Sequence, residues 1–251
     1  MTSTPRISVC IPAYEMNGYG LEFLNHSLKI LENQTFKNFE VVVADQSEDD
    51  GIRNLCLKKW NMELRHITTK NLKKNASTNA NAAIENSRAK IVKILFQDDF
   101  LFCNDALMKI SGAFDEKYVK WVLTGCAHSQ NGKTLFRPLT PKYHKLIHYG
   151  KNTVSSPSVL AFVKDEAPRF DEELVWLMDV DFYKKCEIIW DYPKIIPAPL
   201  VVNRIHNAQV SKKIDSKTIR KELKIIRKTY GGDESWRDWL HYIGRLRKTY
   251  F

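Results

Sequence analysis

Two adjacent aspartates, Asp98 and Asp99, are the strongest chemical signal in the sequence, because they follow closely on an apolar segment at residues 90–96 (KIVKILF). Neighbouring carboxylates repel each other and are costly unless a cation lies beside them. A hard divalent cation, held by one or two carboxylates and by the phosphates of a substrate, is the usual solution. The structural alternative is an exposed acidic turn, or the N-cap of a helix over residues 100–111.

The elements around this pair predict where other polar groups lie. Short apolar segments predict strands at residues 7–12, 39–44, 63–68 and 90–96, and helices are expected at 21–31, 51–60 and 78–87. This alternation predicts βαβ units and a mostly parallel sheet, whose strand carboxyl ends share one ligand-binding edge. Tyr14, Glu15 and Asp45 follow two of these strands. We therefore expect them to lie beside Asp98 and Asp99, which favours the chemical interpretation of the pair.

The second half of the chain has a different pattern. Residues 118–127 and 134–137, separated by Asn131-Gly132, predict a β-hairpin with a tight turn. A strand is expected at residues 159–163, a helix at about 179–189, and two terminal helices at 215–230 and 233–249. The sequence therefore predicts one α/β domain with a C-terminal helical extension.

Composition limits the class of protein. The 251 residues are 43% hydrophobic, which is enough for one substantial core, and no run reaches the roughly 18 apolar residues that a membrane span needs. Residues 1–6 do not resemble a signal peptide. The five scattered cysteines suggest neither a zinc site nor a disulfide framework, so a cytoplasmic protein is expected. A net charge of +10 calls for an anionic partner, although the basic run at residues 211–228 equally fits a solvated helix face.

Five segments, in order along the chain, resemble glycosyltransferase family 2, whose fold is called GT-A. ISVCIPAYE is similar to the family's first strand and P-x-Y-N/E turn, and QTFKNFEVVVADQSED to its second strand and D-x-S end. NANAAIENSRAKIVKILFQDD is similar to the N-x-A-I helix and the strand leading into the D-x-D metal motif. FDEELVWLMDVDFYKKC and NRIHNAQVS are similar to the segment with the catalytic base and to a late R-x-H motif. The resemblance covers about residues 7–211.

This resemblance implies a GT-A fold and a set of residues that bind the nucleotide. That set consists of Pro12, Ala13, Tyr14, Glu15, Asp45, Asn81 and Asp98. Tyr14 would pack against the base, unless it is ordinary core, and Glu15 would lie near the ribose. Asp45 would accept a hydrogen bond from the N3–H of uracil or thymine, unless it only forms a turn.

The resemblance also implies a metal and a general base. Asp99 would be the direct ligand of Mn²⁺ or Mg²⁺, which acts as a Lewis acid on the departing diphosphate. His206 would be a further metal ligand and Arg204 would bind the diphosphate, although a lone histidine is more often structural. Asp179 would take the proton from the acceptor hydroxyl in a single inverting displacement. Asp181, two residues further along a helix, is the competing base but would face elsewhere.

Three positions depart from the family pattern. Gln97 stands where the first carboxylate of D-x-D often lies, so metal binding depends more heavily on Asp99. Met178 replaces the acid that usually precedes the base, and Asp45 lacks the usual neighbouring aspartate and glycine. These departures leave metal affinity and donor choice open.

The predicted protein is an inverting glycosyltransferase that moves a sugar from a nucleotide sugar, UDP or dTDP favoured, to a glycan or lipid-linked acceptor. Its predicted parts are a GT-A domain at residues 1–211, with a nucleotide-binding half (1–115) and an acceptor-binding half (116–211), and a basic helical extension at 212–251.

A protein that only binds sugar nucleotide is the first alternative, and the retained Asp99 and Asp179 argue against it. A pyrophosphorylase would need a Gly-rich basic loop, which PAYEMNGYG lacks. No nucleic-acid partner is expected, because no motif for one is present.

The terminal helix carries a separate hypothesis. Apolar residues recur there at helical spacing: Trp236, Trp239, Leu240, Ile243 and Leu246. With the basic residues beside them, they predict either peripheral contact with an anionic membrane through residues 212–251 or packing against the domain or a second subunit.

Overall fold

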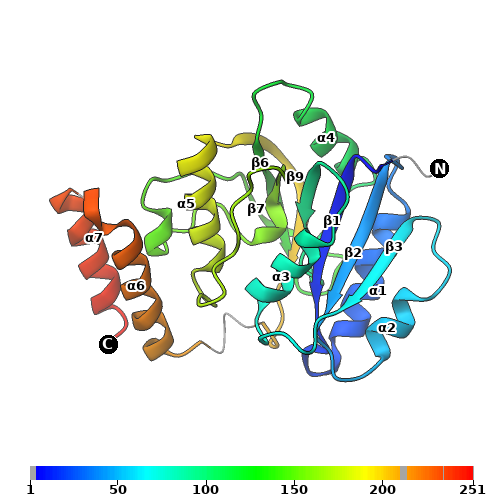
Figure 1. The fold of residues 1–251 in the computed structure, drawn as a ribbon, viewed down its shortest axis with the longest axis horizontal. Helices are drawn as coiled ribbons and strands as arrows, with labels where there is room; N and C mark the ends of the chain where they lie inside the picture. Colours follow the sequence, from blue (N-terminus) through cyan, green and yellow to red (C-terminus); the bar gives the residue numbers. More distant parts are fainter. Residues whose placement is uncertain (1–3, 210–213, 234, 251) are drawn as a thin grey trace.

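In the computed structural model, which describes residues 4–209, 214–233 and 235–250, the predicted N-terminal strands form a parallel sheet. The strands are β1 (Ile7–Ala13), β2 (Phe39–Asp45), β3 (Glu63–Thr68) and β4 (Ile91–Ile94), in the order β3-β2-β1-β4. Every residue of β1 and β2 is buried, which explains why both read as continuous apolar runs. Their carboxyl ends point to one edge of the sheet (Figure 1).

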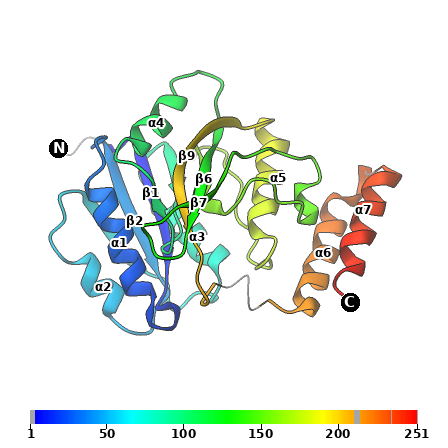
Figure 2. The same ribbon diagram turned by 180° about the vertical axis from the view of Figure 1, so that it is seen from behind.

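Helices cover both faces of this parallel half. Helices α1 (Gly20–Glu32) and α2 (Gly51–Cys56) lie on one face, with the 3₁₀ turn η1 (Met16–Gly18) before α1, and α3 (Ala76–Glu85) lies on the other (Figures 1 and 2). Helix α1 buries the stripe formed by Leu24, Leu28 and Leu31, as the helical spacing of apolar residues requires. The predicted helices are confirmed, although α2 is shorter than the expected 51–60.

The second half of the sheet is mixed. Strand β8 (Leu160–Val163) pairs antiparallel with β4 and with β6 (Trp121–Ser129), and β6 forms the predicted hairpin with β7 (Phe136–Leu139). The short β5 (Phe100–Leu101) pairs antiparallel with β9 (Lys194–Arg204), which runs parallel to β6. Helix α4 (Ala106–Ala113) and the 3₁₀ turns η2 (Ile147–Tyr149) and η3 (Pro157–Val159) complete this half. The first four strands are thus all parallel, as expected, whereas the second half combines antiparallel pairs with the parallel pair of β6 and β9.

Strand β9 is an element that the sequence did not predict. Pro197 and Pro199 interrupt its apolar pattern, and prolines are normally excluded from inner strands because they lack an N–H. The register between β6 and β9 shifts on both sides of Gly125. A Cβ atom at Gly125 would lie 2.3 Å from the carbonyl oxygen of Pro197, so the glycine permits the close approach that accommodates the prolines.

The C-terminal helices lie at the end of the molecule opposite to β3 (Figures 1 and 2). Helix α5 (Met178–Trp190) is followed by α6 (Ser216–Tyr230), η5 (Gly231–Asp233) and α7 (Trp236–Arg247). The predicted boundary at residues 211 and 212, and the first part of the basic run, lie outside the described residues. In the parts of the chain that the structure describes, no helix is both long and apolar enough to span a bilayer.

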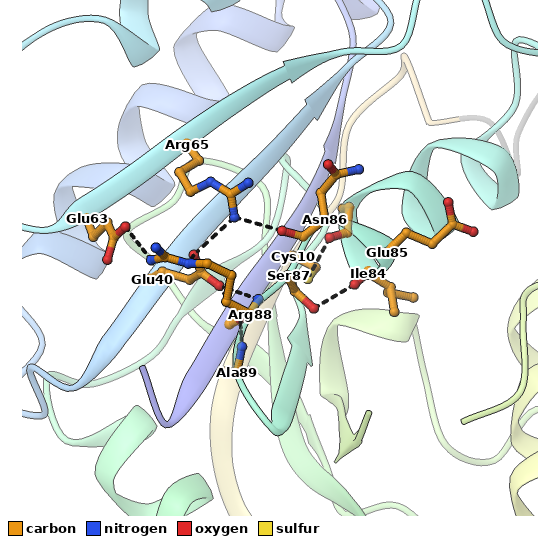
Figure 3. A network of polar contacts seen from close by, with 12 residues as sticks. Cys10, Glu40, Glu63, Arg65, Ile84, Glu85, Asn86, Ser87, Arg88 and Ala89 are labelled. Carbon is orange, nitrogen blue, oxygen red and sulfur yellow. Dashed lines mark hydrogen bonds and ion pairs between the residues drawn. The ribbon is translucent and has the colours of Figure 1, made fainter. Parts of the chain in front are cut away.

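A buried carboxylate joins the amino ends of the parallel strands, at the edge opposite to their carboxyl ends (Figure 3). Glu40 at the start of β2 is fully buried and accepts hydrogen bonds from Ser8 Oγ at 2.7 Å and from the Arg88 backbone N–H and Nε at 2.7 and 2.9 Å. Arg88 also pairs with Glu63 on β3, and Arg65 lies 3.4 Å from Glu40. These bonds compensate the desolvated charge, so this acid of the second-strand segment has a structural role.

Candidate functional site

A cavity of about 820 Å³ lies at the carboxyl ends of β1 and β4 and extends to the start of α5. It is large enough for a drug-sized ligand. Seven of the predicted site residues line it: Pro12, Tyr14, Glu15, Asp98, Asp99, Asp179 and Arg204. Segments far apart in the sequence therefore meet in one cavity, as the sheet topology predicts.

The turn after β1 is held to the Asp98-Asp99 segment by Gln97. The Gln97 side chain accepts a hydrogen bond from the Tyr14 N–H at 2.5 Å and donates one to the Tyr14 carbonyl at 2.9 Å. Gly20 makes this packing possible, because a Cβ atom there would lie 2.1 Å from the same carbonyl. Gln97, which stands where a carboxylate of the D-x-D motif often lies, thus joins the turn after β1 to the Asp98-Asp99 segment.

Glu15 offers the cavity an unused acceptor. Its Oε2 atom is buried and has no hydrogen-bond partner among the described residues. A buried acceptor without a partner is costly, unless a ligand supplies the donor. The hydroxyls of a ribose are donors of that kind.

Asp98 and Asp99 are held by groups from the end of β9 and the loop after it. His206 Nε2 lies 2.9 Å from Asp98 Oδ2, and His206 Nδ1 accepts the N–H of Ala208 at 3.2 Å. Asp99 accepts hydrogen bonds from the Arg204 backbone N–H at 3.0 Å and from Ser156 Oγ at 3.1 Å. The R-I-H segment thus fixes the position of both carboxylates.

Asp99 is difficult to ionise in the unliganded protein. Its residue is 5% exposed, and burial, with a smaller contribution from the neighbouring Asp98 carboxylate, raises the pKa of Asp99 to about 7. The hydrogen bonds from Ser158, Arg204 and Ser156 oppose this shift only in part. A cation beside the pair would restore the ionised form.

The donor set fits a cation that also binds substrate, rather than a cation held by protein alone. Within residues 4–209, 214–233 and 235–250, no three His, Cys, Asp or Glu side chains converge on one point. Mg²⁺ in phosphate-binding sites is usually held by one or two carboxylates together with substrate phosphates. Asp98 and Asp99 provide two such carboxylates at the cavity wall, whereas both ring nitrogens of His206 already have partners.

Asp179 lines the same cavity as the aspartate pair and lies in the first turn of α5. Asn152 donates a hydrogen bond to Asp179 Oδ2 at 2.8 Å, and the Val180 N–H donates to Oδ1 at 2.8 Å. Burial is the largest cause that raises the pKa of Asp179 to about 7. A carboxylate with that pKa suits proton abstraction at neutral pH.

Asp181 has the surroundings of a structural residue. It is 1% exposed, its Oδ1 accepts the Tyr230 hydroxyl at 2.6 Å, and its Oδ2 lies 2.7 Å from Lys185 Nζ. It does not line the cavity. This agrees with the expectation that it faces elsewhere on the helix.

Asp45 lies at a second, adjoining cavity of about 520 Å³, whereas its neighbour Gln46 lines the first. Its Oδ1 accepts the Ser47 N–H, and its Oδ2 lies 2.9 Å from His66 Nε2. Burial opposes ionisation, but the bonds from His66 and Ser47 outweigh it and lower the pKa of Asp45. Asp45 is thus ionised at the edge of the site and does not share the main cavity with Asp99 and Asp179.

The structure corrects three of the predicted contacts. Ala13 is fully buried, and Asn81 is buried with its amide bonded to the backbone N–H and carbonyl of Phe170 at 3.0 and 2.9 Å, so neither lines the cavity. Arg204 lines the cavity, but its guanidinium is engaged by protein groups: Nε donates to the Asp98 carbonyl at 3.1 Å, Nη2 lies 2.9 Å from His26 Nδ1, and the group stacks on Phe23. Its donors and ring contacts fix the Asp98 backbone instead.

Two cavity residues were missed in the sequence. Asn79 lines the cavity and donates a hydrogen bond to the Ala13 carbonyl at 2.9 Å. It is two residues from Asn81 and hence about 200° away around helix α3, so only one of the two can face the site. Lys74, in the loop after β3, also lines the cavity, and the signal for it was the basic stretch KNLKKN at the carboxyl end of a predicted strand.

Comparison with known proteins agrees with this geometry. The family model described as glycosyl transferase family 2 matches residues 8–165. An uncharacterized glycosyltransferase of Rickettsia bellii is 28% identical over 235 residues, which cover 86% of this chain and 32% of the relative. A GalNAc(5)-diNAcBac-PP-undecaprenol beta-1,3-glucosyltransferase of Campylobacter jejuni is 25% identical over 130 residues, 51% of this chain and 40% of the relative. The chain thus spans about a third to two fifths of the length of these two relatives.

Solved structures show the same fold. S. aureus TarS 1–349 in complex with UDP-GlcNAc superimposes with a TM-score of 0.68 at 16% identity, over 98% of this chain and 71% of that one. The mannosyltransferase PcManGT of Pyrobaculum calidifontis, in complex with GDP-Man and Mn²⁺, gives a TM-score of 0.63 at 16% identity, over 98% and 70% of the two chains. The fold is therefore GT-A, as predicted. A family model that matches residues 8–165, more than half of the chain, shows that this chain belongs to glycosyl transferase family 2.

Proposed function

We propose that the chain transfers a sugar from a nucleoside diphosphate sugar to a hydroxyl group of a glycan or lipid-linked acceptor, with inversion at the anomeric carbon. The observation that supports this most is the single cavity that Asp98, Asp99 and Asp179 all line. UDP or dTDP is the favoured nucleotide, because Asp45 is an ionised acceptor at the nucleotide edge. TarS, with its UDP-GlcNAc, and the undecaprenol-linked substrate in the name of the C. jejuni relative support the donor and acceptor classes.

Residues at the β1 end would bind the nucleoside. Tyr14 offers a half-buried ring, and Glu15 offers the unused acceptor for a ribose hydroxyl. The diphosphate would lie between Asp98, Asp99 and Lys74, which supplies a cationic side chain at the cavity wall. We propose Lys74 for the diphosphate-binding role that was predicted for Arg204.

Asp99, with Asp98 beside it, would hold a divalent cation, Mn²⁺ or Mg²⁺. Such a cation supplies Lewis-acid stabilisation of the negative charge on the departing diphosphate. PcManGT, with GDP-Man and Mn²⁺, supports this assignment. His206 is better placed to orient Asp98 than to bind the cation directly, since both its nitrogens are engaged.

Asp179 would act as the general base. Its carboxylate takes the proton of the acceptor hydroxyl while that oxygen forms a bond to the anomeric carbon. The bond from the anomeric carbon to the diphosphate oxygen breaks, and its electron pair leaves with the nucleoside diphosphate. Attack and departure on opposite faces of the sugar invert the configuration.

A screen of nucleotide sugars tests the function directly. With Mn²⁺ or Mg²⁺ present, we expect slow metal-dependent release of nucleoside diphosphate from one UDP- or dTDP-sugar, and a thermal shift with the free nucleotide. The release should accelerate when a suitable acceptor is added. Nucleotide binding without any release would instead support the sugar-nucleotide-binding alternative, and absence of both would contradict the proposal.

The division of the chain into residues 1–115, 116–211 and 212–251 remains our proposal for its functional parts, and the last part has a surface suited to membranes. Four exposed lysines recur on one face of α6, opposite to its buried residues: Lys217, Lys221, Lys224 and Lys228. On the adjoining α7, Trp236, Trp239 and Leu240 are 67%, 46% and 49% exposed. Lysines beside exposed tryptophans are typical of helices that lie on anionic lipid. We propose that this surface docks the enzyme on a membrane containing its lipid-linked acceptor.

Vesicle co-sedimentation tests the membrane proposal. We expect binding to phosphatidylglycerol vesicles and not to phosphatidylcholine alone. Each lysine near an anionic surface contributes about 1 kcal/mol, so replacing the four lysines of α6 by Gln should weaken partitioning roughly 100-fold or more. The matched control replaces exposed lysines elsewhere, Lys58, Lys59, Lys117 and Lys133, and should bind almost as the wild type. Equal losses in both variants, or no binding to anionic vesicles, would refute a specific docking surface.

A further inference from the structure

The C-terminal helices reach back to the segment that carries Asp179. Glu222, on the inner face of α6, is 1% exposed. Its Oε1 accepts the N–H of Val175 at 2.9 Å, and its Oε2 accepts the N–H groups of Trp176 and Leu177 at 2.9 and 2.8 Å. Three consecutive backbone donors therefore converge on one carboxylate, immediately before α5 begins.

This contact fixes the backbone that leads into α5. Leu177, the N-cap residue of α5, has no side-chain oxygen and makes no capping bond. N–H groups at a helix start need acceptors, and negative charge is favoured there by the helix dipole. Glu222 accepts from the N-cap residue Leu177 and the two residues before it, and its negative charge lies near the amino end of α5, close in sequence to Asp179.

A second contact holds the other side of Asp179. Arg245, on α7, donates from Nε to the Tyr149 carbonyl at 3.0 Å and from Nη2 to the Gly150 carbonyl. Two residues further along, Asn152 donates the hydrogen bond to Asp179 Oδ2. The extension thus contacts both the backbone before Asp179 and the loop that orients its carboxylate.

We infer that Glu222 is a positioning residue for the general base, so that the C-terminal helical pair is an integral part of the catalytic site. This inference relies on the proposed function of Asp179. The three hydrogen bonds to Glu222 also explain how the segment Val175–Leu177 keeps one conformation, although this segment is neither helix nor strand. Val175 and Trp176 line the cavity beside Asp179, so a shift of this segment would move the acceptor side of the site as well.

The substitution Glu222→Gln tests the inference with little change of shape. The amide retains one acceptor but turns an N–H₂ group toward backbone N–H donors, so the segment should relax. We expect kcat to fall at least about tenfold, while the Kd for UDP and the KM for the donor stay within about twofold, because the nucleotide edge is distant from α6. Rates are expressed per UDP-binding site, so that any unfolded fraction is excluded.

The pH profile provides a readout that a purely structural role would not change. The groups that face Asp179 are the Glu222 carboxylate from α6, the Tyr183 phenol on α5 and the neutral Asn152 amide. Burial is the main cause of the raised pKa of Asp179, and the Glu222 charge adds to it. The pH below which kcat falls, because Asp179 becomes protonated, should therefore be lower in Glu222→Gln than in the wild type.

Two further variants make the outcome decisive. Thr229→Ala, at an exposed position of the same helix whose hydroxyl bonds only the Ile225 carbonyl, should leave kcat and its pH dependence unchanged. Arg245→Met keeps the apolar stem but loses the bonds to residues 149 and 150, and should also lower kcat with little change in UDP affinity. An active wild type with normal kcat in both Glu222→Gln and Arg245→Met would overturn the inference, whereas a wild type without transfer or UDP binding would refute the proposed function itself.

Discussion

Replacing Asp179 by Asn is expected to lower kcat about 10²- to 10⁴-fold, the usual contribution of a positioned general base. Asn has nearly the same shape and keeps an oxygen that can accept the Asn152 hydrogen bond, now 2.8 Å long. What it lacks is the ability to take a proton from the acceptor hydroxyl. The Kd for UDP, measured by calorimetry with Mn²⁺ present, should change less than twofold, because the role proposed for Asp179 is at the acceptor and not at the nucleotide.

Asp181→Asn is the matched control on the same helix. Asp181 lies in the same first turn of α5, but it pairs with Lys185 and Tyr230 and does not line the cavity. We expect a lower melting temperature and a kcat within about twofold of the wild type. A normal transfer rate in Asp179→Asn would show that another group removes the proton.

The pH dependence of kcat should report the same group. Burial raises the pKa of Asp179 to about 7, so the carboxylate is largely protonated and inactive as a base below that pH. We therefore expect kcat, measured at saturating donor and metal, to rise with pH and level off above about 7. If the fall in rate at acidic pH disappears when donor and metal are saturating, the titrating group acts in binding and not in catalysis. A limb near the ordinary pKa of an aspartate, about 4, would contradict the desolvated environment that the structure shows.

The parallel half of the fold follows from the sequence because its signals are local. β-Branched apolar runs, helical spacing and short polar turns fix β1 to β4, and parallel pairing then brings Tyr14, Glu15, Asp98 and Asp99 to one edge. β9 could not be predicted in this way. Its prolines oppose a strand locally, and only the glycine at position 125 on a partner strand makes the pairing possible.

Side-chain direction is the part of the site that the sequence could not determine. Asn79 and Asn81 are alike in type and differ only in helical phase, which a shift of one residue in the helix would reverse. Arg204 lines the cavity, but the Asp98 carbonyl, His26 and aromatic rings from α1 and β5 already engage its guanidinium. Glu222 carries no motif, because its three partners are backbone N–H groups that any residues would supply.

Asp99→Asn should abolish metal-dependent nucleotide binding while leaving the fold intact. Asn can still accept the Arg204 N–H and contact Ser156, which now bond to Asp99 at 3.0 and 3.1 Å. It lacks the negative charge that a hard cation requires. In the wild type, Mn²⁺ and UDP should each strengthen binding of the other by the same factor, as linkage requires. In the variant, that factor should fall to about one, with a loss of UDP affinity of roughly 100-fold or about 2.7 kcal/mol.

Measurements of unfolding stability distinguish the loss of the Asp99 charge from damage to the fold. Burial raises the pKa of Asp99 from 3.8 to about 7, so the folded protein binds this proton more tightly than the unfolded chain does. Ionisation of Asp99 should therefore reduce the stability of the unliganded wild type as pH rises through that interval. The other acids with raised pKa values, Asp179, Asp181 and Glu222, contribute equally in both proteins, so the stability of Asp99→Asn relative to the wild type should rise over the same range. At pH 8 the variant should unfold at the same urea concentration as the wild type or a higher one, although it no longer binds nucleotide with metal. A variant that kept metal-dependent UDP binding would remove Asp99 from the cation site, and equal pH slopes would show that its carboxylate is not desolvated.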